Sequence, residues 1–239
     1  SIIIKYNKCI MKKIAVFKQG IFEELPLQLG VFPFGIIYGI MAIESGLTPI
    51  QAFLMSSIIF GGASQIAFVQ LISSATPLGV VVTTVSAINS RHFLYSISMM
   101  EYLKNLSLKW RIVLSYLLTD EAYAVSIRRF INEPSTSFLH FHLLGTGITL
   151  FLSWQISTLI GVLVGGDLPQ FLDLQFIIPL TFIAIIVPMI KSISTFFVVI
   201  ASAFSGLILK SFDINFWIVI SGMIGVVIGL ISSKLDKKR

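Results

Sequence analysis

Charged residues and cysteines are both scarce in this sequence. Asp, Glu, Lys and Arg make up only 12% of its 239 residues, and hydrophobic residues make up 56%. Soluble domains contain about 25% charged residues, so this composition excludes an ordinary soluble domain and predicts a membrane protein. The single cysteine, Cys9, excludes an internal disulfide and any cysteine-based metal site.

Signatures of common enzymes are missing as well. The chain has no Gly-x-Ser-x-Gly, no phosphate-binding loop and no His-Glu-x-x-His. We therefore expect neither enzymatic activity nor a cofactor. His140 and His142 have no cysteine or carboxylate beside them in the sequence, which favours interfacial residues over metal ligands. No signal peptide is expected, because the basic start is not followed by a short apolar run with a cleavage site.

Positive charge is concentrated at the two ends of the chain, whose net charge is +6. By the positive-inside rule, both ends are expected in the cytoplasm. The tails are short and carry no interleaved aromatic residues, which argues against nucleic-acid binding. We expect a basic cytoplasmic segment over residues 1–24, one transmembrane domain over 25–233 and a basic cytoplasmic tail over 234–239.

Long apolar runs separated by Gly, Pro and polar turns indicate an all-α, polytopic transmembrane bundle. The expected spans are 25–43, 50–73, 76–100, 112–127, 138–164, 174–190, 192–209 and 215–231. Eight spans keep both tails on one side but place the basic connection 101–111 outside, so seven remain an alternative. Stretches 39–49 and 161–169 share a Gly-bearing span end, a turn and a proline, a pattern compatible with an inverted repeat.

The second expected span contains the sequence Gly61-Gly62-Ala63-Ser64-Gln65. Two adjacent glycines each cost a helix about 1 kcal/mol relative to alanine. One explanation is close helix packing through small residues. The other is a broken helix that leaves free backbone groups in the middle of the membrane. The sequence leaves both open.

Polar residues also interrupt the run 76–100, which otherwise resembles one long apolar helix. Arg91 lies about nine residues from its end, so roughly 13 Å deep. An arginine there costs about 2.5–3.5 kcal/mol on insertion scales, and a partner, a cavity or a function must compensate it. Asn89 and Arg91 point about 200° apart on a regular helix. The helix is therefore either interrupted or polar on two buried sides.

Asp120 and Glu121 occupy the middle of the run 112–127, at the same expected depth as Arg91. Unpaired charges are not tolerated in hydrocarbon, so we expect Arg91 and Asp120 to compensate each other. They form either a static pair that holds the fold or a polar site on a transport path. His92 titrates near neutral pH, as a proton-coupled carrier requires, although it could simply bond to a neighbouring helix.

Three of these motifs carry a resemblance to a known family. They are Phe60-Gly-Gly-Ala-Ser-Gln65, Asn89-Ser-Arg-His92 with Tyr95, and Leu118-Thr-Asp-Glu-Ala-Tyr-Ala124. Their order and spacing resemble the AzlC family, the large subunits of bacterial branched-chain amino acid exporters. Ser90 departs from that family's pattern, in which a leucine is expected. The resemblance implies export of Leu, Ile and Val, with Met as a further candidate, driven by an ion gradient together with a small hydrophobic subunit resembling AzlD.

The resulting hypothesis is a multi-pass carrier of the bacterial plasma membrane with its site at mid-depth between the second, third and fourth spans. Two other classes stay open: a passive channel for small amphipathic solutes, and an assembly subunit without a site of its own. Charge pairing or ion coupling is assigned to His92, Asp120 and Glu121. The expected substrate-binding residues are Gly61, Gly62, Ser64, Gln65, Asn89, Arg91 and Tyr95.

Overall fold

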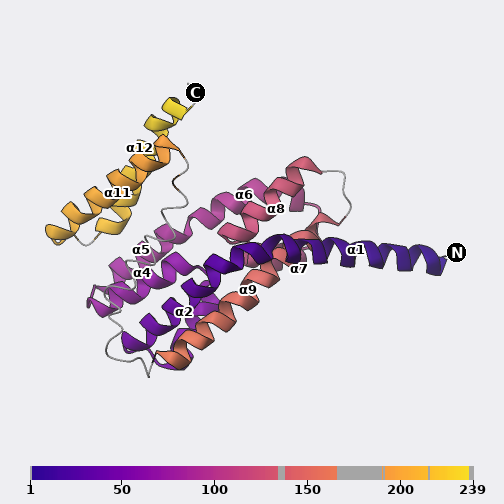
Figure 1. Cartoon of the computed structure of the whole chain (residues 1–239), viewed down its shortest axis with the longest axis horizontal. Coiled ribbons are helices and arrows are strands. Elements are labelled where there is room, and N and C mark those ends of the chain that lie inside the picture. The colour runs from indigo at the N-terminus through magenta and orange to yellow at the C-terminus, as the bar shows by residue number, and fades with distance from the viewer. Residues whose placement is uncertain (1, 134–137, 166–189, 191, 215, 237–239) are drawn as a thin grey trace. The chain divides into compact units, whose positions relative to one another are not determined.

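The structure is a computed structural model that describes residues 2–133, 138–165, 190, 192–214 and 216–236 (Figure 1). Every element in these ranges is helical and no strand occurs in them, which confirms the all-α prediction. The elements are α1 Ile2–Glu24, η1 Leu25–Leu27, α2 Gln28–Glu44, α3 Pro49–Ile59, α4 Gly62–Ser73, α5 Leu78–Asn89, α6 Arg91–Leu103, α7 Leu108–Leu117, α8 Asp120–Asn132, α9 Leu139–Val164, α11 Ile193–Ser211 and α12 Trp217–Asp236.

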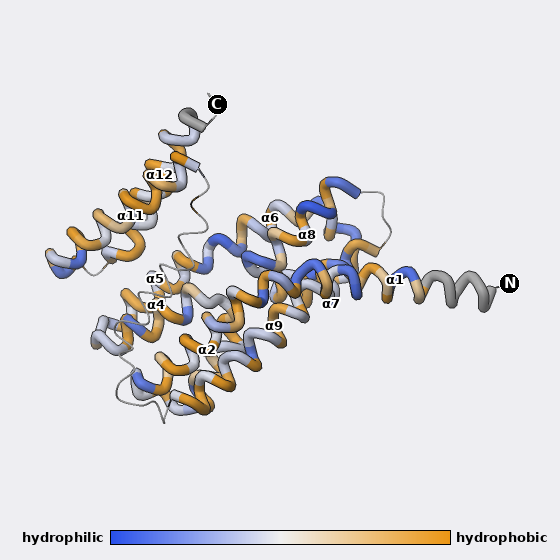
Figure 2. The backbone as a smooth tube through the Cα atoms, viewed as in Figure 1, coloured by the Kyte–Doolittle hydropathy of each residue, from blue (hydrophilic) through white to orange (hydrophobic). Residues whose placement is uncertain are grey.

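Several helices in the described ranges suit a membrane. Three helical stretches there are long and apolar enough to cross one, namely Ile10–Glu44, Leu139–Val164 and Ile193–Ser211. Figure 2 shows that hydrophobic residues dominate α2, α9, α11 and α12. Residues 174–189 of the predicted span 174–190 lie outside the described residues, so the number of spans stays a prediction.

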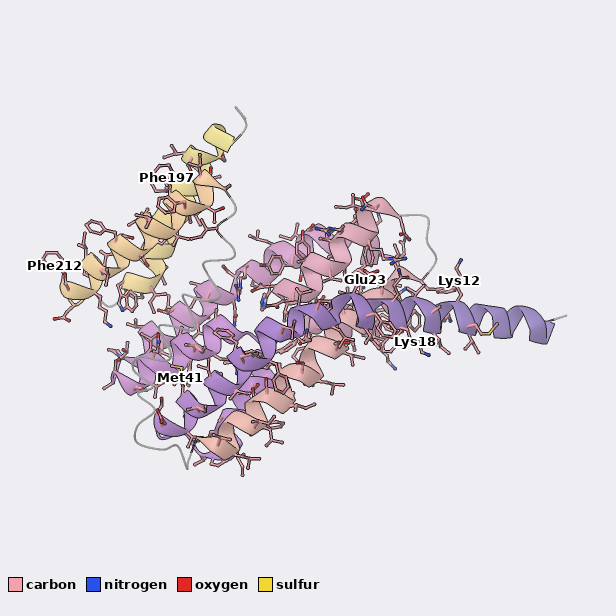
Figure 3. The ribbon with its side chains drawn as sticks, in the orientation of Figure 1. Lys12, Lys18, Glu23, Met41, Phe197 and Phe212 are labelled. Atoms are coloured by element: carbon pink, nitrogen blue, oxygen red, sulfur yellow. The ribbon has the colours of Figure 1, made fainter. Side chains whose placement is uncertain are left out.

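The chain divides into two compact units, Ser1–Gln65 with Asn89–Asp167, and Ile66–Ile88 with Leu168–Arg239. In the first unit α9 is the central helix, because α1, α2, α3, α7 and α8 all pack on it. In the second unit α11 and α12 form an antiparallel hairpin (Figure 1). Phe197 and Phe212 project outward from that hairpin, as lipid-facing side chains do (Figure 3).

Glycines bring α1 and α2 close to α9. A Cβ atom on Gly161 would collide with the carbonyl oxygen of Ile36, and one on Gly39 would lie 2.5 Å from the carbonyl oxygen of Thr158. On α1, a Cβ atom at Gly20 would collide with the carbonyl oxygen of His142. Small residues at such contacts let helix backbones approach closely in membrane proteins. These glycines lie where α1 and α2 pack along α9 (Figure 1).

The glycine-rich motif of the second expected span is a true break, so the broken-helix alternative is confirmed. Helix α3 begins at Pro49 with Thr48 as its cap, as the Thr-Pro sequence predicts, and ends at Ile59. Phe60 then adopts a left-handed conformation (φ 40°, ψ 53°), which is uncommon for a residue with a side chain. Helix α4 starts at Gly62.

The prediction of one helix over 76–100 is wrong, because the run is divided at Ser90. Helix α5 ends at Asn89 and α6 begins at Arg91. Asn and Ser side chains compete with the helix for backbone hydrogen bonds, which favours an interruption at these two residues. Of the two alternatives for this polar stretch, the interrupted helix is the one observed.

The prediction of one short span over 112–127 is also wrong. Helix α7 ends at Leu117 and α8 begins at Asp120, with Thr119 in an extended conformation between them. No Gly or Pro marks this break. The available signal is Thr119 followed by Asp120 and Glu121 in the first turn, a pattern typical of a helix start because acidic side chains favour the positive end of the helix dipole.

Candidate functional site

The three helix interruptions meet in the first unit. A Cβ atom placed on Gly61 would lie 3.0 Å from Asn89 Oδ1 and 3.7 Å from His92 Cε1, so the first two breaks are in contact. The Arg91 guanidinium Nη1 lies 2.7 Å from Asp120 Oδ2, which joins the second break to the third. The Arg91–Asp120 ion pair, which was expected from the equal depth of the two residues, is therefore present. It joins helices α6 and α8.

This ion pair is not sealed off. The side chains of Arg91 and Asp120 retain 33% and 35% of their accessible surface. Each also keeps one buried atom without a partner, Nε of Arg91 and Oδ1 of Asp120. The pair therefore compensates the two charges and still leaves a donor and an acceptor for a further group. Glu121 follows in the first turn of α8.

Aromatic residues of α2 and α9 pack against the start of α4 and form an aromatic wall there. Trp154 Nε1 donates a hydrogen bond to Gln65 Oε1 at 3.0 Å, and the Trp154 ring stacks on Tyr38 with centroids 6.3 Å apart. A Cβ atom on Gly62 would lie 2.7 Å from the Phe34 ring and 2.9 Å from the Trp154 ring. Only glycine therefore lets the start of α4 sit against these rings. Sequence reasoning missed Trp154 as a site neighbour.

A second aromatic group lies beside the ion pair on α6 and α8. The rings of Tyr95 and Tyr123 stack with centroids 4.6 Å apart, and the Tyr123 hydroxyl is 2.9 Å from Ser98 Oγ. The His92 ring lies 6.0 Å from that of Tyr95. Tyr95 is thus next to His92 and to the pair, as its position one turn after Arg91 indicates.

Buried polar atoms without partners gather at the interruptions. Buried polar groups in proteins are hydrogen-bonded in the great majority of cases, so such a group of exceptions requires an explanation. Among the described residues the unpartnered atoms at the three breaks are Gln65 Nε2, Asn89 Oδ1, Arg91 Nε, His92 Nε2, Thr119 Oγ1 and Asp120 Oδ1. They include donors and acceptors, and all but Thr119 belong to predicted site residues.

Other predicted polar residues have local partners instead. Ser64 Oγ donates to the carbonyl oxygen of Gly61 at 2.7 Å, so it stabilises the break itself. Gln155, the neighbour of Trp154 on α9, fastens α9 to α3. Its Oε1 accepts from Ser57 Oγ at 2.9 Å, and its Nε2 donates to the carbonyl oxygen of Ser56 at 3.3 Å. These contacts hold the frame around the site.

His142, predicted to be interfacial, has a carboxylate partner that the sequence did not reveal. Its side chain is fully buried, and its Nε2 lies 2.9 Å from Glu23 Oε2. The other Glu23 oxygen accepts from Arg129 at 2.9 Å. Glu23 is 119 residues away in sequence, so sequence spacing could not reveal this carboxylate. Figure 3 places Glu23 on α1 close to α8 and α9.

Removing the indole donor is expected to destabilise the protein. Trp154→Phe leaves Gln65 Oε1 buried without its donor, which costs about 1–3 kcal/mol. The measurement is thermal unfolding of the purified protein in detergent. Adding Gln65→Leu to Trp154→Phe removes both partners and should restore part of the loss. An unfolding temperature unchanged in the single variant would show that this hydrogen bond contributes nothing.

Comparison with known proteins assigns this sequence to a family. The model of the AzlC protein family matches residues 26–168, which include all three interruptions. An uncharacterized membrane protein of Archaeoglobus fulgidus is 29% identical over 185 residues, covering 76% of this chain and 79% of its own. The inner membrane protein YgaZ of Escherichia coli is 27% identical, with 65% and 64% covered.

A named transport protein is also similar. The branched-chain amino acid transport protein AzlC of Bacillus subtilis is 26% identical over 153 residues, which cover 64% of this chain and 59% of that protein. No solved structure matches. The apolar helices agree with the membrane assignment of these relatives, and the chain is a membrane protein. The family match covers more than half of the sequence, so the chain belongs to the AzlC family.

Proposed function

We propose that this chain is a secondary transporter that exports branched-chain amino acids across the bacterial plasma membrane. The observation that carries the proposal is the meeting of three helix interruptions around an ion pair with unpartnered donors and acceptors. Ionisable residues inside membranes usually mark substrate or ion pathways. The name of the Bacillus subtilis relative, a branched-chain amino acid transport protein, supports the substrate class.

The polar atoms suit both ends of an amino acid. The substrate carboxylate would accept from the free backbone N–H groups at the start of α4 and from Arg91 Nε. The substrate ammonium group would donate to Asp120 Oδ1 and Asn89 Oδ1, which are buried acceptors without donors. His92, Asp120 and Glu121 would carry charge compensation or ion coupling. Three of the six unpartnered atoms at the breaks, on Arg91, Asp120 and Asn89, would then gain a partner when substrate binds.

The aliphatic side chain would contact the aromatic wall formed by Phe34 and Trp154. Such a pocket separates leucine from valine only weakly, because one methylene group is worth about 1–3 kcal/mol. We therefore expect a broad range that includes leucine, isoleucine and valine, with methionine as a further candidate. Competition by each unlabelled amino acid against labelled leucine measures this range.

The proposal includes a membrane arrangement and a partner. Both termini lie in the cytoplasm by the positive-inside rule, with the basic segment 1–24 and the tail 234–239 flanking a transmembrane domain over 25–233. A small hydrophobic subunit resembling AzlD completes the transporter, and an ion or proton gradient drives export. The resemblance of the three motifs to the AzlC family supports this arrangement.

Leucine efflux from vesicles tests the proposed function. Vesicles containing this chain, with and without the small subunit, are loaded with labelled leucine, and a proton gradient is imposed. We expect efflux that saturates with leucine concentration and accelerates with the gradient. Flux that neither saturates nor responds to the gradient would identify a channel. The absence of leucine flux under both conditions would favour an assembly subunit and contradict the proposal.

A further inference from the structure

Two adjacent glutamates at the end of α1 have opposite surroundings. Glu23 contacts His142 and Arg129, each at 2.9 Å. Glu24 points to another side of the helix, because successive residues are about 100° apart. Its side chain is fully buried, and no cation among the described residues forms an ion pair with it. Both residues belong to segment 1–24, which the sequence predicts to be basic and cytoplasmic. No role for Glu24 follows from the sequence.

The Glu24 carboxyl group has one partner and one free oxygen. Gln28 Nε2 donates to Glu24 Oε1 at 3.0 Å, whereas Glu24 Oε2 is buried without any partner. Gln28 Oε1 is a second buried acceptor that lacks a donor. The surroundings of Glu24 and Gln28 therefore contain more buried hydrogen-bond acceptors than donors, and within the described ranges they contain no cation that forms an ion pair with Glu24. An ionised carboxylate here would bear a desolvation penalty that the single side-chain hydrogen bond from Gln28 offsets only in part.

The charged groups of the neighbouring helices do not supply that cation. Helices α8 and α9 pack on α1. On α8, Asp120 is bound to Arg91, Arg129 is bound to Glu23 and Glu133, and Arg128 is exposed. On α9, His142 is bound to Glu23 and His140 packs on Trp110. The remaining charged group is Glu121 on α8, which packs on α1, and its electrostatic interaction with Glu24 is repulsive.

Glu121 also connects Glu24 to the candidate substrate site. It follows Asp120 in the first turn of α8, and it interacts electrostatically with both Asp120 and Arg91. Electrostatic interactions therefore link Glu24 to Glu121, and Glu121 to the Arg91–Asp120 ion pair. Two neighbouring carboxyl groups in a buried place favour sharing one proton over ionising together.

We propose that Glu24 carries the proton that couples transport to the proton gradient, with Glu121 as the group that exchanges it. This inference rests on the proposed function and adds a residue that touches no substrate. The chemistry is a protonation alone. An O–H bond forms on a Glu24 carboxyl oxygen when the proton arrives and breaks when the proton leaves by way of Glu121. The free Oε2 and the lack of a cation fit a carboxyl that is protonated in this structure.

The test separates proton coupling from substrate movement. Reconstituted vesicles are assayed for leucine counterflow without a proton gradient and for uphill leucine movement driven by one. Glu24→Gln imitates the protonated acid and keeps an oxygen for Gln28. We expect counterflow within twofold of wild type and a loss of gradient-driven movement of at least about tenfold. Glu24→Asp keeps an ionisable group and should retain part of the driven movement.

Glu44→Gln is the matched control, because it makes the same change at an exposed position at the end of α2 and should alter neither assay. Gradient-driven movement at the wild-type level in Glu24→Gln would overturn the inference. If wild type shows neither counterflow nor driven movement, the proposed function itself fails and the inference fails with it.

Infrared spectroscopy provides a readout that does not depend on Glu24→Gln folding. Wild-type protein is expected to show the C=O stretch of a protonated, buried carboxyl group. That band should shift in Glu24→Asp, because the shorter side chain changes the hydrogen bond to Gln28. A band that is absent from wild type, or identical in the two proteins, would overturn the inference.

Discussion

Arg91→Ala is expected to reduce leucine efflux by at least about a hundredfold. The substitution removes the guanidinium that the proposal assigns to the substrate carboxylate, and it leaves the partly buried charge of Asp120 uncompensated. Breaking a buried ion pair by removing one partner costs about 3–5 kcal/mol. The Arg91 and Asp120 side chains are one-third exposed, so solvent screening reduces that cost to the lower end or below it. Efflux is measured at matched protein levels, so that lost protein is not mistaken for lost transport.

Two further variants separate binding from charge compensation. Arg91→Lys keeps the positive charge but loses the planar group with several donors, so we expect a stable protein with strongly reduced efflux. Asp120→Asn in the Arg91→Ala background removes the uncompensated acid and should restore stability without restoring transport. If Arg91→Ala and Asp120→Asn each retain wild-type efflux, these residues do not form the substrate site.

Gly161→Ala is expected to give the largest loss of folded protein. Its new Cβ atom would collide with the Ile36 carbonyl oxygen and lie 2.9 Å from the Gly39 Cα atom. These are backbone atoms, which cannot move aside as a flexible side chain can. Overpacking typically costs about 1–3 kcal/mol, and we expect the upper end here. That corresponds to a fall in Tm of about 10 °C for a chain of this size.

Gly30→Ala is the control for this substitution. Gly30 lies on α2, the helix against which Gly161 of α9 packs, but an added Cβ atom there meets nothing within 4 Å. Alanine favours a helix by about 1 kcal/mol over glycine, so Tm should stay level or rise slightly. Thermal unfolding in detergent measures both variants. Equal Tm values for Gly161→Ala and wild type would show that the close contact between α2 and α9 is not required.

Local sequence signals gave an interruption as one of two alternatives at two of the three breaks, and no interruption was predicted at the third. Gly61 and Gly62 favour an interruption because two adjacent glycines destabilise a helix. Asn89 and Arg91 point in different directions on a regular helix, which requires either an interrupted helix or one that is buried on two sides. At Thr119 the hydrophobic run continues on both sides, so a single span was predicted there, although Thr119, Asp120 and Glu121 form a pattern typical of a helix start. The roles of these residues in binding and coupling stay predictions.

The amino-acid sequence by itself determined that this is an all-α membrane protein and that its polar residues lie inside apolar runs. Both conclusions follow from hydropathy, which depends only on residues that are close together in the sequence. Only the tertiary structure decided which of these residues meet. Trp154 bonds to Gln65 across 89 residues, and His142 bonds to Glu23 across 119. Such partners depend on which helix faces pack together, and that is also why Glu23 bonds to Arg129 and His142 while Glu24 forms no ion pair within the described part of the chain.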